Sequence, residues 1–108
     1  GLTSDCDPVV EQISASIPER SALLGNYPNP AVGSTTIEVR VAEPGPVRLE
    51  VYDLLGRKVS TLIDREMMPG TYQVEWTRSE TARLSSGTYL YRLEAGDVAT
   101  SRKLTLLR

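Results

Sequence analysis

The chain has 108 residues, a formal net charge of −2, one cysteine and no histidine. This length fits a single domain, which can bury about two-thirds of its unfolded surface. A nucleic-acid binder needs a concentrated basic face, so the mild acidity disfavours that class. The lack of histidine excludes a Ser-His-Asp or Cys-His catalytic arrangement and a typical zinc site. We therefore expect no enzyme, no cofactor and no metal, and no apolar run reaches the ~20 residues that span a bilayer.

Residues 1–21 are polar and proline-containing and lack strand alternation, which indicates a linker. One hypothesis within this linker is a short helix, with Asp7 as its cap and Pro8 at its first position. Four apolar residues would then share one face of that helix: Val9, Val10, Ile13 and Ile17. Cys6 has no partner for a disulfide in its own domain. Because the first residue is not an initiator methionine, we expect a fragment cut from a larger protein.

From residue 34 onward the pattern changes to period two. Each run has one apolar face and one largely charged face, which is typical of a half-buried antiparallel strand. Clear runs cover residues 37–41, 47–51, 72–76 and 89–93, and weaker runs cover 58–64 and 98–107. Turn signals containing glycine separate these runs. We therefore predict an all-β fold over residues 22–108, an immunoglobulin-like antiparallel β-sandwich of about seven strands.

Aromatic residues allow two interpretations. Tyr89 and Tyr91 share a face with Leu93, and an exposed aromatic row on a sandwich can bind sugars. Such a row on an apolar face is more often part of the core, and Trp76 is expected to be the central core ring. The solvent exposure of these rings and of Tyr52 therefore distinguishes the two interpretations: exposed rings favour a carbohydrate-binding module, and buried rings leave no platform for a sugar.

The segment 25–30 reads GNYPNP. Proline fixes its own φ and restricts the preceding residue, so this segment runs extended and then turns sharply. Asn29 is available to bond neighbouring backbone. The physical interpretation is a rigid entry into the first core strand, with Tyr27 packed against the sandwich.

The segment 51–57 reads VYDLLGR and predicts a hairpin. Gly56 is expected to adopt a positive φ in the tight turn. Arg57 can contact a receptor or pair with Asp53 across the hairpin, and we favour the pairing, which at a surface is worth at most ~1 kcal/mol.

A third signature, SGTYLYRL at residues 86–93, follows the other two, and the basic pair Arg102-Lys103 and an apolar run precede the end of the chain. This ordered set over residues 24–108 resembles the type A C-terminal sorting domain of type IX secretion cargo. Its first landmark matches at Asn26, Tyr27, Pro28, Asn29 and Pro30. One departure is Ala31-Val32, where many relatives carry Phe-Asn.

The resemblance implies a non-catalytic secretion and sorting signal fused to an N-terminal cargo protein. It implies that the cargo passes through the periplasm, that an outer-membrane translocon or shuttle reads the domain, and that a sortase attaches the cargo at the cell surface. The hypothetical recognition residues are Gly56, Arg57, Arg102, Lys103, Leu104, Leu106, Leu107 and Arg108. The alternative function is a carbohydrate-binding or passive cell-surface module of a larger secreted protein.

The strand at residues 104–107 has two open interpretations. It can lie at a sheet edge and add to a strand of a partner, with Arg102, Lys103 and Arg108 making charge-assisted contacts. It can also simply complete the sandwich, and the two roles are compatible.

Overall fold

The computed structural model describes residues 9–14 and 20–107, and most of these residues lie in strands. The strands are β1 (Val9–Ser14), β2 (Ala22–Val32), β3 (Ser34–Val41), β4 (Gly45–Tyr52), β5 (Lys58–Met67), β6 (Gly70–Trp76), β7 (Gly87–Ala95) and β8 (Val98–Leu107). A single short helix, α1 (Arg78–Thr81), connects β6 to β7 in the described part of the chain.

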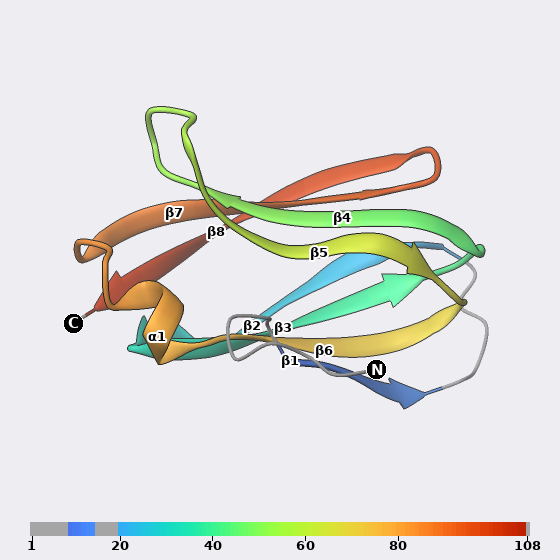
Figure 1. Ribbon diagram of the computed structural model, residues 1–108, viewed down its shortest axis with the longest axis horizontal. Coiled ribbons are helices and arrows are strands. Elements are labelled where there is room, and N and C mark those ends of the chain that lie inside the picture. The colour runs from blue at the N-terminus through green and yellow to red at the C-terminus, as the bar shows by residue number, and fades with distance from the viewer. Residues whose placement is uncertain (1–8, 15–19, 108) are drawn as a thin grey trace.

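The strands form two layers that face each other (Figure 1). One layer has the order β1-β6-β3-β2 and the other β8-β7-β4-β5. All pairings are antiparallel except a short parallel contact between β2 and β8, where Ala31 lies opposite Leu106 and Val32 opposite Leu107. The predicted all-β sandwich is confirmed, with eight strands where about seven were expected.

The core lies between the layers because alternate residues of each strand point inward. Trp76 and Tyr91 are fully buried, and the Trp76 ring meets Tyr89 edge-on at 5.9 Å between centroids. The Trp76 indole Nε1 donates a hydrogen bond to Ser60 Oγ at 3.0 Å, so its polar atom is satisfied. Burying each large apolar side chain contributes about 1.5–3 kcal/mol, and this core needs no disulfide. The expectation that these rings belong to the core is confirmed.

The N-terminal segment differs from its prediction. Residues Val9–Ser14 form strand β1, which pairs antiparallel with β6, so the predicted helix is wrong for these residues. A two-turn helix is marginal alone, whereas the free edge of β6 offers a ladder of backbone partners and β-branched residues favour strands. Cys6, Asp7, Pro8 and Ile17 lie outside the described residues. The linker over residues 1–21 and the domain boundary after it stay predictions.

Candidate functional site

The three sequence signatures and the end of the chain meet at one end of the sandwich, on the left of Figure 1. Gly87, at the start of β7, pairs with Leu106 on one side of β8. Ala31, just after the GNYPNP segment, pairs with the same Leu106 on the other side. The hairpin between β4 and β5, which carries the VYDLLGR signature, projects from this end as well. The first and third signatures are thus assembled around the last residues of β8, and the hairpin lies at the same end of the sandwich.

The last part of β8, residues 104–107, is enclosed, and we call it the closed segment. Leu104 and Leu106 are buried in the core. The backbone N–H of Thr105 donates to Asn29 Oδ1 at 3.3 Å, and the carbonyl of Leu107 accepts from the backbone N–H of Gly33 at 3.3 Å. Asn29 was expected to bond neighbouring backbone, and it instead accepts from a backbone N–H that lies 76 residues away in sequence. The closed segment therefore completes the sandwich, because its outer edge is already taken by the first signature and the turn that follows it.

Asn26 fixes the first signature to the opposite layer. Its Oδ1 accepts from the hydroxyl of the buried Tyr91 at 3.1 Å, and its Nδ2 donates to the carbonyl of Pro28 at 3.2 Å. Thr35 Oγ1 donates to the same Pro28 carbonyl at 2.8 Å. Burial raises the pKa of Tyr91, so its hydroxyl stays a neutral donor. Sequence reasoning missed this role of Asn26, since no local pattern relates it to a tyrosine 65 residues away.

Tyr27 does not pack against the sandwich as expected, because 82% of its surface is exposed. The contacts of Asn26 hold the segment in place and leave the next residue facing solvent. Tyr27 borders a surface hollow of about 400 Å³, which is also lined by Leu24, Gly25, Asn26, Thr36, Glu38 and Gln73.

The aromatic residues that could have formed a sugar platform are mostly hidden. Trp76, Tyr89 and Tyr91 are buried, and Tyr52 is half-buried with its hydroxyl bonded to Glu50. The Tyr89 hydroxyl donates to the carbonyl of Ser85 at 2.7 Å. This aromatic row is therefore part of the core and offers no stacking surface.

The hairpin after β4 is held by Asp53. Its Oδ1 accepts from the backbone N–H groups of Leu55 and Arg57 at 2.9 and 3.0 Å, and its Oδ2 accepts from Arg57 Nε at 2.8 Å. The backbone hydrogen bond from Arg57 is the largest of the causes that hold the pKa of Asp53 below its ordinary value. Gly56 has φ +85°, so the predicted turn and the predicted Arg57–Asp53 pair are both confirmed.

Two leucines stand exposed on this hairpin. The exposed fraction is 64% for Leu54 and 79% for Leu55. Neither was expected to be functional, although their position between a strand end and a turn glycine was a usable signal. We call residues 53–57 the hairpin tip: a rigid loop that presents apolar side chains beside the Arg57 guanidinium.

The basic pair lies just before the closed segment, and both side chains are exposed. Arg102 Nε donates to the carbonyl of Leu23 at 3.1 Å, across to β2. Among the residues that the structure describes, neither Arg102 nor Lys103 has a carboxylate within 4.0 Å. Arg108, the last predicted recognition residue, lies outside the described residues.

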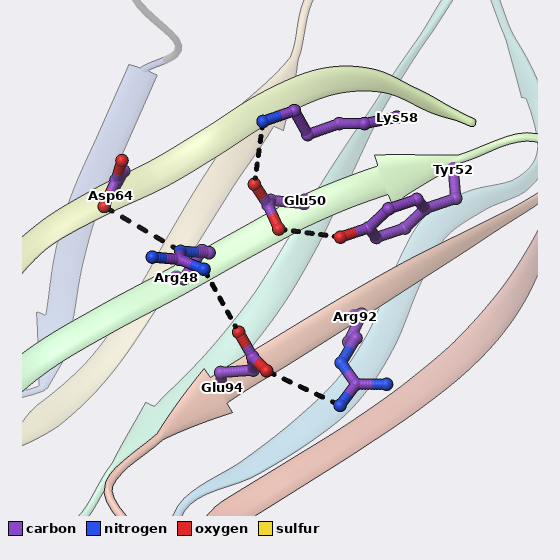
Figure 2. Close-up of polar contacts among 7 residues, drawn as sticks. All are labelled: Arg48, Glu50, Tyr52, Lys58, Asp64, Arg92 and Glu94. Atoms are coloured by element: carbon purple, nitrogen blue, oxygen red, sulfur yellow. Dashed lines mark hydrogen bonds and ion pairs between the residues drawn. The ribbon is translucent and has the colours of Figure 1, made fainter. Parts of the chain in front are cut away.

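The outer face of β4, β5 and β7 carries two sets of polar contacts (Figure 2). Glu50 accepts from the hydroxyl of Tyr52 at 2.8 Å and from Lys58 Nζ at 3.2 Å. Burial alone would raise the pKa of Glu50, but the hydrogen bonds from Tyr52 and Lys58 bring it below its ordinary value. Arg48 lies 4.0 Å from Asp64 and 3.6 Å from Glu94. Every charge in this group has an opposite partner, so we assign the group to stability.

Within residues 9–14 and 20–107, no cluster of three or more acidic, histidine or cysteine side chains could hold a metal ion. Nor does that part of the chain contain a helix long and apolar enough to cross a membrane.

Residues 26–106 match the family model of the secretion system C-terminal sorting domain. The chain belongs to this family. The match begins at the first landmark asparagine and ends at the buried Leu106 of the closed segment, so it includes all three signatures except Gly25, the first residue of GNYPNP. No curated protein and no solved structure matched the chain. The sorting domain is a non-catalytic signal of type IX secretion that interacts with the secretion machinery, and the cargo it accompanies is secreted with a cell-surface destination.

Proposed function

We propose that the outer-membrane translocon and its shuttle read the sorting domain at the end where the signatures meet. The observation that carries the proposal is that two family signatures border the closed segment of β8, while the hairpin tip with the third projects from the same end of the sandwich. The proposed recognition residues are those expected from the sequence: Gly56, Arg57, Arg102, Lys103, Leu104, Leu106, Leu107 and Arg108.

These residues divide into contact and positioning residues. Arg102 and Lys103 are exposed cations without a nearby carboxylate in the described part of the chain, so they are available to an acidic partner surface. Leu104 and Leu106 are buried, so they act by holding the closed segment in place. Gly56 shapes the hairpin tip, where Arg57 is joined by Leu54 and Leu55.

The hairpin tip suits recognition because it is rigid before binding. Asp53 accepts three hydrogen bonds from the tip, so little conformational entropy is lost when a partner closes over it. Two exposed leucines beside a cation can fill an apolar pocket with an acidic rim. In this proposal the cargo crosses the periplasm with the domain folded, and a sortase then cuts in the linker and attaches the cargo at the surface.

The route is tested with a fluorescent reporter fused to residues 1–108 in a bacterium with type IX secretion. We expect surface signal for the fusion, periplasmic signal for the reporter without the domain, and periplasmic signal for the fusion in a strain lacking the translocon. Equal surface signal in the two strains would contradict the proposed route.

The site is tested by substitution, because removing residues 103–108 would also remove the buried Leu104 and Leu106 and unfold the domain. The double variant Arg102→Gln/Lys103→Gln keeps the core. We expect it to fold normally in a urea titration and to lose most of the surface signal. Full export of this variant would contradict the assignment of the basic pair.

A further inference from the structure

The first part of β8 has a free backbone edge. β8 pairs with β7 along nearly its whole length, from Val98 opposite Ala95 to Leu106 opposite Gly87. Its pairing with β2 covers only Leu106 and Leu107. In the described part of the chain, no strand pairs with the other edge of β8 before that point.

The direction of each backbone group follows from one contact. The N–H of Thr105 points away from β7, because it donates to Asn29. In an antiparallel ladder the direction alternates, so every second residue before Thr105 also points outward. Those residues are Ala99, Ser101 and Lys103, and their N–H and C=O groups have no partner among the described residues. We call residues 99–103 the open segment.

β5, at the opposite edge of the same layer, is protected against strand addition, whereas the open segment is not. β5 carries the exposed charges Asp64, Arg65 and Glu66 in succession, and its pairing with β4 has two register irregularities. Charges and bulges of this kind discourage strand addition. The open segment is regular in its pairing with β7, contains no proline, and presents the small side chains of Ala99 and Ser101.

The charges beside the open segment indicate the partner. Arg102 and Lys103 are exposed and lack a carboxylate neighbour within the described residues. Arg92, opposite Ser101, is 3.5 Å from Glu94, and Glu94 is shared with Arg48. The local charge is therefore positive, which favours an acidic segment over a second copy of this basic edge.

We propose that the open segment accepts an extended, acidic strand of the secretion machinery through backbone pairing with Ala99, Ser101 and Lys103. This proposal rests on the proposed function, and it locates strand addition before the closed segment, where residues 104–107 are already covered. The outward N–H and C=O groups of the open segment can pair with the backbone of another extended chain. Acidic side chains on that chain would also supply carboxylates to Arg102 and Lys103.

Proline at position 101 tests the pairing. Ser101→Pro removes an outward N–H and adds a ring at the edge, with no ladder hydrogen bond to β7 lost. In the reporter fusion we expect about a tenfold lower surface signal, which corresponds to the loss of one or two backbone hydrogen bonds. The matched control Ser101→Ala keeps the backbone and should export normally. If Ser101→Pro fails to fold in a urea titration, Ala99→Pro is the second variant.

Hydrogen exchange gives an independent readout. Residues 1–108 are mixed with the purified outer-membrane secretion complex in detergent, and we expect at least about tenfold slower exchange of the amides of Ala99, Ser101 and Lys103. Protection confined to the hairpin tip would overturn strand addition. A concentration-dependent dimer that Ser101→Pro abolishes, without protection by the complex, would overturn it in favour of self-pairing.

The two proposals fail separately. Normal export of Ser101→Pro together with lost export of Arg102→Gln/Lys103→Gln would overturn strand addition and leave the recognition site standing. Normal export of the unsubstituted fusion in a strain without the translocon would contradict the proposed function itself.

Discussion

β5 and β8 are the two outer strands of one layer, and they are built differently. β5 has three successive exposed charges, and its Lys58 is tied to Glu50 of the neighbouring strand. β8 is covered by Asn29 and β2 in its closed segment; in its open segment the outward backbone groups have no strand partner among the described residues, and only the Arg102 side chain reaches β2. The edge of a layer can thus be protected by exposed charges or by other residues packed over it. The open segment has neither protection against an acidic strand, so a partner strand of that kind can add there.

The largest effect is expected in the closed segment. Leu106→Ala removes a fully buried side chain between the two layers and should lower the free energy of unfolding by about 3 kcal/mol. Leu107→Ala is the matched control, because Leu107 is 43% exposed, and its cost should stay below about 0.5 kcal/mol. Urea titration measures both, and equal costs would contradict the enclosure of Leu106.

A smaller loss of stability is expected when the Asn29 side chain, which covers the edge of β8 at Thr105, is removed. Asn29→Ala removes the acceptor for the Thr105 N–H and should cost about 1 kcal/mol. It should also speed hydrogen exchange at Thr105 while leaving Ser101 unchanged, since Ser101 has no such cover. Slow exchange at Thr105 in the variant would show that Asn29 does not close this edge.

The β5 side gives a pH-dependent effect. The pKa of Glu50 is lowered from the ordinary value of 4.5, so its contribution is complete above that value and is lost as the pH falls through the folded-state pKa. Glu50→Gln should therefore cost about 1 kcal/mol at pH 7 and almost nothing at low pH. Urea titrations at a series of pH values check the difference, and a difference independent of pH would contradict the ionised Glu50–Lys58 pair.

The smallest effect on stability is expected where the β5 charges are removed. Asp64→Ser/Arg65→Ser/Glu66→Ser changes only exposed side chains and breaks only the exposed 4.0 Å pair of Asp64 with Arg48, so it should shift the unfolding free energy by less than about 0.5 kcal/mol. It should nevertheless promote self-association in sedimentation measurements, because the edge loses its charges. A variant that stays monomeric at high concentration would mean that these charges do not protect β5.

The sequence predicted most of the sandwich because period-two alternation reports directly which face of a strand is buried. The runs from Ile37 to Val41 and from Tyr89 to Leu93 became buried faces of β3 and β7, and the weak run at 98–107 became β8 with the same bounds. β1 was missed because its stability comes from the edge of β6, a partner that is distant in sequence.

The candidate site was predictable only where its contacts are local. The Asp53–Arg57 pair and the turn at Gly56 follow from five consecutive residues, and both were found. The contact of Asn26 with Tyr91 and the exposure of Tyr27 depend on how the two layers meet. The outward direction of Ser101 likewise follows from a contact between Asn29 and Thr105, which are 76 residues apart.

The most direct test compares the two ends of the sandwich in one export assay. The signature-end variant Leu54→Ser/Leu55→Ser and the opposite-end variant Glu43→Gln/Asp97→Asn change exposed or solvent-facing side chains and should fold alike. With the reporter fused to residues 1–108, we expect surface signal to be lost in the first variant and kept in the second. Equal export of the two variants would contradict recognition at the signature end.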